Sequence, residues 1–305
     1  MIVTNGTTLK IVSSNSSDVA IDGDGTQQLF DVHDATLSIS NVNLENGNGT
    51  NGGAIYGHYA DVRCSDCRFF GNRASEEGGA ITLKESNVSF TGETYCLRNS
   101  AGSDGGFLSA TGSSSVVFEG NSTFEDNISD GRGGVIFAYY VEQVTFKGPS
   151  RFYKNTAYDS GGAIYVQGTP LSFPREDSTV EFVNNNVTTL FGGALAVAGK
   201  EPLTMNVSAL FKNNSASTGG AAYVTGRAAN SIISRARFVS NSASLDGGAL
   251  VMNRNGGSIG TDTPESVVVI NCTFEDNHAS RGGGAMVVAS GNVEINDTIF
   301  RNNIA

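Results

Sequence analysis

Acidic residues recur shortly before a pair of glycines in this chain, and carboxylates are groups that could bind a metal ion. They are Glu77, Asp104, Asp159 and Asp246. Ca²⁺ prefers oxygen ligands such as these, but neighbouring repeats do not hold an acid at this place regularly. The stretch Ile-Asp-Gly-Asp-Gly at residues 21–25 is similar. Because acids in glycine turns are usually solvated, we expect no cofactor, with weakly bound calcium as the alternative.

The four cysteines offer thiol or metal chemistry. Cys64-Ser-Asp-Cys67 is half of a metal or redox signature, and the other half is missing because Cys96 and Cys272 stand alone. We expect buried thiols that behave as small apolar side chains. A disulfide among Cys64, Cys67 and Cys96 is one alternative, and a metal site is another. Cys272 is too many repeats away to reach the other three.

Five tyrosines cluster in two neighbouring repeats, where they could stack on sugar rings. They are Tyr139, Tyr140, Tyr153, Tyr158 and Tyr165. We expect them to pack against the core and its edges, with sugar stacking as the alternative.

A repeated sequence motif, here called the phrase, must position these side chains. FKNNSASTGGAAYV at residues 211–224 returns as FVSNSASLDGGALV at residues 238–251. Its Gly-Gly pair starts at residues 52, 78, 105, 133, 161, 192, 219, 247 and 283. This spacing of about 27 residues predicts one elongated domain over residues 1–305. Residues 1–45 are expected to form opening coils without the full phrase, and residues 46–305 carry the repeats.

The pattern within each repeat indicates strands. In SVVVINCTF, residues 266–274, the apolar side chains alternate, which is a strand period. The apolar run after each Gly-Gly, such as AIYV at residues 163–166, is too short for a helix. The sequence therefore predicts an all-β parallel β-helix, or solenoid, of about ten to eleven coils. Because FRNNIA at residues 300–305 stops within the phrase, we also expect the chain to be part of a longer protein.

Each position of the phrase has an expected structural role. The phenylalanine points inward and stacks on its counterparts. The asparagine three residues later sits at a turn, tolerates a left-handed backbone and can bond its amide to the asparagines above and below. The Gly-Gly pair allows a corner that a Cβ would block. The motif positions are Gly78, Gly79, Asn72, Phe124, Asn127, Phe152, Asn155, Gly161, Gly162, Phe211, Asn214, Phe238, Asn241, Gly247, Gly248, Phe274 and Asn277.

Length variation is confined to one arc of each repeat. The phenylalanine, or Cys96, lies 8 to 10 residues before the next Gly-Gly, whereas 17 to 27 residues separate Gly-Gly from the next phenylalanine. Insertions in a solenoid collect on one side. We therefore predict a binding ridge of four loops at residues 167–177, 198–202, 225–230 and 253–266. Its candidate binding residues are Arg175, Lys200, Arg227 and Arg254.

The pairing of GGA[ILV] with FxxN resembles the repeat of the chlamydial polymorphic outer-membrane proteins over essentially residues 40–305. Gly-Gly-Ala-Ile starts at residues 52, 78 and 161, and Gly-Gly-Ala-Leu at residues 192 and 247. The resemblance implies a right-handed parallel β-helix that is displayed outside the cell or on its surface and used for adhesion. Cys96 in place of phenylalanine and Phe107 in place of alanine depart from the pattern.

An enzyme that degrades polysaccharides is the alternative function, because pectate lyases and polygalacturonases share this fold. Their hydrolases need paired carboxylates, and their lyases need calcium-bound acids with a basic residue. Neither the Asn-Thr-Asp and Gly-Asp-Asp pair nor the Asp-His and Arg-x-Pro-x-x-Arg runs occur here. His33, His58 and His278 stand apart without metal-ligand spacing. We therefore predict a protein that is not an enzyme.

Composition limits the partners. The formal net charge is -11 and the basic residues are scattered. The chain therefore lacks the clustered basic residues that bind nucleic acid, and we expect no nucleic-acid partner. No apolar run is long enough for a membrane span. We expect a protein or glycan of a host or cell surface as the partner, and the oligomeric state is left open.

Eleven glycosylation sequons suggest a glycoprotein, at Asn5, Asn15, Asn48, Asn87, Asn121, Asn127, Asn186, Asn206, Asn213, Asn271 and Asn296.

Overall fold

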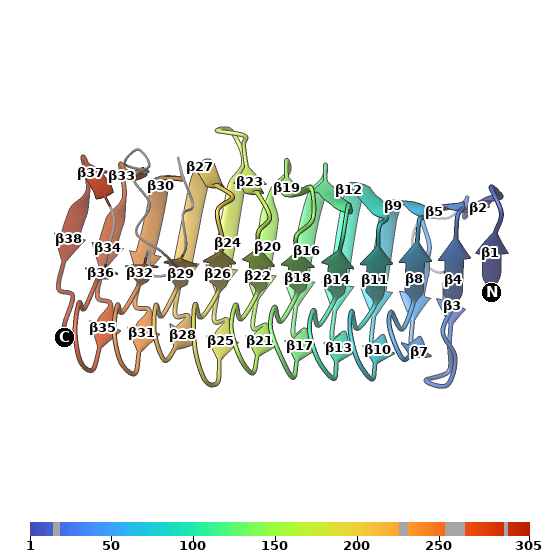
Figure 1. The fold of residues 1–305 in the computed structure, drawn as a ribbon, viewed down its shortest axis with the longest axis horizontal. Helices are drawn as coiled ribbons and strands as arrows, with labels where there is room; N and C mark the ends of the chain where they lie inside the picture. The colour runs from blue at the N-terminus through green and yellow to red at the C-terminus, as the bar shows by residue number, and fades with distance from the viewer. Residues whose placement is uncertain (15–18, 226–230, 254–265, 290–291) are drawn as a thin grey trace.

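The computed structural model describes residues 1–14, 19–225, 231–253, 266–289 and 292–305. The regular structure in these residues consists of parallel strands, without a helix. Each coil contributes strands to three long sheets, here named A, B and C in the order in which the chain enters them. The strands follow one another along the long axis in sequence order, from the N-terminus at one end to the C-terminus at the other (Figure 1). The predicted parallel β-solenoid is confirmed.

Sheet A holds the short apolar runs that follow Gly-Gly. It has eleven strands: β1 (Ile2–Thr4), β4 (Phe30–His33), β8 (Ile55–His58), β11 (Ile81–Lys84), β14 (Leu108–Thr111), β18 (Ile136–Tyr139), β22 (Ile164–Gln167), β26 (Leu195–Ala198), β29 (Ala222–Thr225), β32 (Leu250–Asn253) and β36 (Met286–Val288).

Sheet B is crossed twice by each coil and forms two ladders. The first ladder contains β2 (Thr8–Val12), β5 (Thr36–Ser40), β15 (Ser115–Phe118), β19 (Gln143–Phe146), β23 (Leu171–Phe173), β33 (Ser266–Ile270) and β37 (Asn292–Asn296). The second contains β3 (Ala20–Asp22), β6 (Asn43–Glu45), β16 (Asn121–Glu125), β20 (Ser150–Tyr153), β24 (Thr179–Val183), β34 (Thr273–Glu275) and β38 (Ile299–Arg301). Long strands run through both: β9 (Asp61–Phe70), β12 (Asn87–Leu97), β27 (Leu203–Lys212) and β30 (Ile232–Val239).

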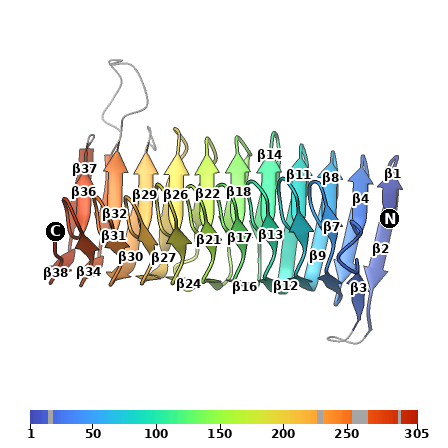
Figure 2. The same ribbon diagram turned by 90° about the horizontal axis from the view of Figure 1, so that it is seen from below.

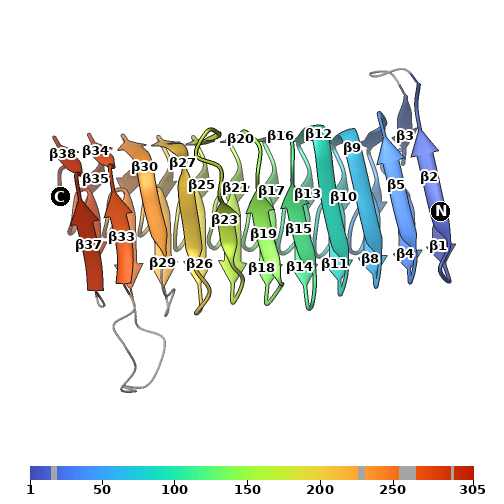
Figure 3. The same cartoon turned by 90° about the horizontal axis from the view of Figure 1, so that it is seen from above.

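Sheet C is a narrow ladder of two-residue strands before each Gly-Gly. It contains β7 (Asn48–Gly49), β10 (Arg73–Ala74), β13 (Ser100–Ala101), β17 (Ile128–Ser129), β21 (Thr156–Ala157), β25 (Asn186–Val187), β28 (Ser215–Ala216), β31 (Ser242–Ala243) and β35 (His278–Ala279). Figures 2 and 3 show the same coils from below and above, where the strands remain in sequence order. The coils therefore stack in chain order, and the pairing shifts register only within sheet B, between Thr91 and Thr94 and between Asn206 and Ala209 among the described pairings.

Stacked phenylalanines fill the core along the second ladder of sheet B. From Phe124 to Phe300 the rings are parallel, with centroids 4.6 to 4.9 Å apart in successive coils. A second column, which the sequence analysis did not predict, runs along the first ladder. It joins Phe90, Phe118, Phe146 and Phe173 at centroid distances of 4.4 to 5.0 Å. Both columns bury large apolar surfaces and fix the register.

A buried ladder of asparagine side chains lies beside the phenylalanine column. Each Nδ2 donates to the Oδ1 of the next asparagine at 2.8 to 3.0 Å, and each also donates to a backbone carbonyl of the preceding coil. The members are Asn72, Asn99, Asn127, Asn155, Asn185, Asn214, Asn241, Asn277 and Asn303. The predicted amide ladder is therefore present.

Asparagine tolerates the left-handed backbone, but the ladder asparagines do not use it. The residue before each of them has the positive φ instead, as in Arg98 with 54° and Lys154 with 53°. The turn places this preceding residue at the outer corner, and the asparagine side chain then points back into the coil. A non-glycine residue in this conformation costs about 1–2 kcal/mol, which the buried ladder offsets.

The two glycines of each pair have different roles. The first has a positive φ of 61 to 72° in all nine pairs, a conformation that favours glycine. The second lies so close to the next coil that an added Cβ would clash with its backbone; for Gly162 the clash is with the carbonyl oxygen of Gly193. The predicted glycine corner is confirmed, and its second half is a close approach between coils.

Candidate functional site

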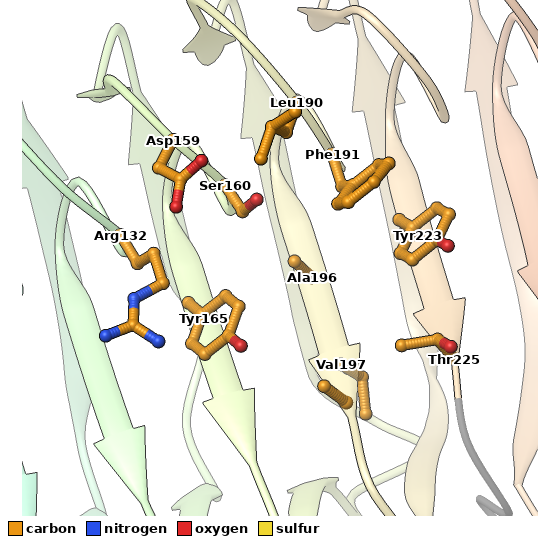
Figure 4. A pocket seen from close by; sticks show the side chains of 11 residues that line it. Arg132, Asp159, Ser160, Tyr165, Leu190, Phe191, Ala196, Val197, Tyr223 and Thr225 are labelled. Atoms are coloured by element: carbon orange, nitrogen blue, oxygen red, sulfur yellow. The ribbon is translucent and has the colours of Figure 1, made fainter. Parts of the chain in front are cut away.

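An aromatic groove on the outer face of sheet A is the candidate site. Tyr165, Ala196 and Tyr223 occupy the same outward position on the neighbouring strands β22, β26 and β29. The small side chain of Ala196 leaves a gap between the two tyrosines, with Phe191 beside Tyr223 (Figure 4). The groove has a volume of about 280 Å³. Its floor is therefore the small side chain of Ala196, which lies between two aromatic side chains of the row.

Strand alternation directs these side chains outward. In β22, Ile164 and Val166 are fully buried in the core, and Tyr165 between them is half-buried on the outside. Phe191 immediately precedes a Gly-Gly pair, where it forms single bridges with Ser160 and Thr218 of the adjacent coils. Its ring stacks on Tyr223 with centroids 4.3 Å apart and an interplanar angle of 15°.

Arg132 and Asp104 form an ion pair beside the groove. Nη2 of Arg132 lies 2.8 Å from Oδ2 of Asp104, and Nε lies 3.2 Å from Oδ1. Partial burial opposes the arginine's charge, but the hydrogen bonds to Asp104 outweigh it, so the pKa of Arg132 lies above its ordinary value. The guanidinium also lies over the rings of Phe137 and Tyr165, 4.6 and 5.1 Å from their centroids. This packing fixes one wall of the groove.

Polar groups edge the groove at both ends. Burial raises the pKa of Tyr165, whose hydroxyl donates to Oε1 of Gln167 at 2.9 Å. Asp159 and Thr225 also line the groove. Among the described residues, Asp159 forms no ion pair. The site thus combines apolar ring surfaces with hydrogen-bonding groups, which suits noncovalent binding of a small amphipathic ligand.

The four acids singled out in the sequence do not converge on one point. Glu77 accepts a hydrogen bond from the Ser109 hydroxyl at 3.1 Å, Asp104 is paired with Arg132, and Asp246 with Arg281. Within the described ranges there is no group of three or more His, Cys, Asp or Glu side chains arranged to hold a metal. Asp159 alone faces the groove. The other three acids serve as contacts between coils.

The predicted ridge is divided between two corners. Lys200 lies in the turn between β26 and β27, where the chain passes from sheet A to sheet B. Arg175 lies between β23 and β24, which both belong to sheet B, and it pairs with Asp177 at 3.0 Å. Figure 3 shows the β26–β27 turn and the β23–β24 turn at opposite ends of the sheet B strands. The prediction of a single flank is therefore wrong, because the variable arc contains two turns.

Two candidate ridge residues, Arg227 and Arg254, lie outside the described residues, as do residues 226–230 and 254–265 of the predicted loops. Their placement stays a prediction.

All four cysteines are buried and free, as the preferred interpretation expects. Hydrogen bonding with Cys67 and burial raise the pKa of Cys64 well above its ordinary value, and burial does the same for Cys96. These thiols stay protonated and act as core side chains.

Histidine contacts show what the sequence analysis missed. His33 and His58 occupy partnered positions of β4 and β8, with ring centroids 5.8 Å apart, although they are far apart in sequence. Stacking of the coils thus makes two residues neighbours in space although they stand apart in the sequence.

Of the five clustered tyrosines, only Tyr165 lines the groove, whereas Phe191 and Tyr223 were not predicted. Tyr139 packs edge-on against Tyr140, with ring centroids 4.6 Å apart, which agrees with edge packing. The signal that could have found the groove is the second position after Gly-Gly-Ala, which holds Tyr165, Ala196 and Tyr223 in three successive repeats.

Comparison with protein families shows which known repeat this one is similar to. The family model described as the Chlamydia polymorphic membrane protein repeat matches residues 66–84, 115–139, 149–167 and 271–285. In these four segments the chain matches the Chlamydia polymorphic membrane protein repeat. Three of the four polymorphic membrane protein matches start shortly before a ladder asparagine, and all contain a Gly-Gly pair. Curated proteins and solved structures yielded no match.

Arg132, Asp159 and Tyr165 lie inside segments matched by the polymorphic membrane protein repeat, whereas Phe191 and Ala196 lie outside them. The groove thus combines motif-bearing and divergent coils. In the described part of the chain, no helix could cross a membrane.

Proposed function

We propose that this chain is a non-catalytic segment of a cell-surface protein, where it serves as a rigid stalk and an adhesive surface. It carries repeats of a membrane-protein family, and its fold is an elongated solenoid. The observation that carries the proposal is the match of the family repeat to segments that build the core. We propose that binding takes place on the outer faces and corners, because the side chains there can differ between coils without disturbing the packing of the core.

A non-enzymatic role is supported by the contacts that the polar side chains make. The recurring acids are engaged by cations or hydroxyls of neighbouring coils, apart from Asp159. The buried polar column consists of amides, which are not proton-transfer groups. We propose that the chain works without a cofactor, since each of these contacts is structural.

The corner between sheets A and B and the groove are the surfaces proposed for a protein or glycan of another cell. Lys200 is exposed at the corner between sheets A and B, and Arg175 at the bend of sheet B. The oligomeric state does not enter the proposal.

The experiment measures adhesion of beads coated with the chain to a panel of cultured cells. A variant in which residues 254–263 are deleted and a variant with Lys200→Glu test the corner between sheets A and B. Arg175→Glu is the matched control at the other corner. We expect weaker adhesion for the first two with an unchanged circular dichroism spectrum. Equal adhesion for all variants and for uncoated beads would contradict the adhesive role.

A further inference from the structure

We infer that the groove above Ala196 binds one neutral pyranose ring of a glycan. The inference deepens the proposed surface role and rests on it, because glycans of this kind are met outside the cell. Its residues are Tyr165, Phe191, Ala196 and Tyr223 with Asp159 and Thr225 at the ends.

The size of the groove selects a single ring. Tyr165 and Tyr223 stand two strands apart, which corresponds to about 9.6 Å at the usual strand spacing. The volume of about 280 Å³ is just below the roughly 300 Å³ at which pockets for larger small molecules begin. A peptide segment or an extended helix face would need a longer groove. One six-membered ring can contact both aromatic walls while resting on Ala196.

The chemistry of the lining favours a sugar over an apolar side chain. A pyranose has C–H faces that pack on aromatic rings and hydroxyls around its edge. Here the aromatic surfaces of Tyr165 and Phe191 lie between polar groups of Asp159 and Thr225. An apolar occupant would remove those polar groups from water without new hydrogen bonds, at a cost of about 1–3 kcal/mol each. Sugar hydroxyls would supply those hydrogen bonds.

Charge selects a neutral sugar. Asp104 balances the guanidinium of Arg132, and among the described residues Asp159 has no ion-pair partner to balance its carboxylate. The chain as a whole has a formal net charge of -11. A uronate or sialic acid would therefore meet repulsion at close range, whereas a neutral hydroxyl can donate a hydrogen bond to the carboxylate of Asp159.

The row of sheet A supplies its own test. Because Ala196 lies between aromatic positions in register, Ala196→Phe would place a ring in the gap and complete the row. The added side chain faces outward and leaves the core unchanged, so folding should persist. Tyr165→Ala instead removes one wall. The matched control is Tyr56→Ala, which removes a half-buried tyrosine from the same outward row of β8, four strands before β22.

The measurement is saturation-transfer-difference NMR on the full chain with methyl glucoside, methyl galactoside, methyl mannoside and N-acetylglucosamine, and with glucuronate as the acidic comparison. We expect a signal from at least one neutral sugar and none from glucuronate. Ala196→Phe and Tyr165→Ala should each weaken the affinity roughly tenfold or more, and Tyr56→Ala should leave it unchanged. Thermal melts of each variant report folding.

Three results would overturn the inference: no signal from any neutral sugar, glucuronate binding as tightly, or binding that survives both groove variants. Displacement by a neutral phenylalanine peptide that itself binds more tightly would also count against a sugar. Bead adhesion is scored separately with the same variants. Adhesion without sugar binding removes only the groove inference, whereas sugar binding without adhesion removes the adhesive role and leaves the groove.

Discussion

Phe107 occupies the part of the core where Cys96 interrupts the phenylalanine column. Cys96 stands in register between Phe69 and Phe124, and the ring of Phe107 lies 5.3 Å from that of Phe69 and 5.8 Å from that of Phe124. In this coil the phrase has a cysteine in place of phenylalanine and a phenylalanine in place of alanine. The two departures from the repeat compensate each other within one layer.

This exchange predicts strong coupling between the two positions. Cys96→Phe alone should overpack the layer and lower the free energy of unfolding by about 1–3 kcal/mol. Phe107→Ala alone should leave a cavity and cost about 3–5 kcal/mol. The double variant restores the common repeat and should be far more stable than the sum of the single effects implies. Urea denaturation in a double-mutant cycle measures the coupling, and additive effects would contradict compensation.

The amide ladder predicts a position-dependent cost. Asn155→Ala removes the acceptor of the backbone N–H and Nδ2 of Asn127 and the donor to the carbonyl of Phe124. Each buried group left without a partner costs about 1–3 kcal/mol, so we expect a loss of at least about 3 kcal/mol in unfolding free energy. Asn303→Ala, at the partly exposed end, is the control and should cost less. Chemical denaturation measures both, and equal losses would argue against the ladder as a stabilising unit.

The second glycine of a pair predicts a clash between coils. Gly162→Ala would press a Cβ against the carbonyl of Gly193, whereas Gly25→Ala meets no atom and adds only a left-handed alanine. We expect Gly25→Ala to cost about 1–2 kcal/mol and Gly162→Ala to cost considerably more. Thermal unfolding followed by circular dichroism checks the order. The reverse order would mean that neighbouring coils separate easily.

The buried thiols predict a loss of stability in alkaline solution. The pKa of Cys64 and of Cys96 is raised in the folded chain, while an unfolded thiol ionises near pH 8.5. Above that pH the unfolded state releases protons that the folded state retains, so the free energy of unfolding falls as pH rises; below it, these groups contribute no slope. Urea denaturation between pH 7 and 10 should show a shallower decline for Cys96→Val than for the natural chain. Identical slopes would contradict the assignment.

Burial of the asparagine ladder predicts which sequon stays unmodified. Asn127 is fully buried and its Nδ2 is hydrogen-bonded to Asn155, whereas Asn87 and Asn121 are exposed. If the chain is expressed through a eukaryotic secretory pathway, mass spectrometry should find glycans on exposed sequons and none on Asn127. A glycan on Asn127 in the folded chain would be incompatible with the ladder.

The repeat period made the core predictable and left the surface undetermined. Stacking of Phe124 on Phe152 follows from a constant distance between the phenylalanine and Gly-Gly. The sequence alone could not distinguish the corner between sheets A and B from the bend within sheet B. The variable arc has no residue at a fixed distance between Gly-Gly and the phenylalanine that would mark either turn. Arg175 was therefore grouped with Lys200. The groove was missed for a related reason: it depends on Ala196, whose small size is informative only when its neighbours in adjacent coils are known.

The hydrogen bonds of the asparagine column all point the same way. Gly47 donates its N–H to Asn72, Asn72 donates to Asn99, and the sequence continues to Asn277 and Asn303. A winding added upside down would set hydrogen atoms against hydrogen atoms at the junction. The solenoid is therefore polar along its axis, with free amide donors required at one side of each junction and acceptors at the other. A duplicated repeat can extend it only in the same orientation as the existing coils.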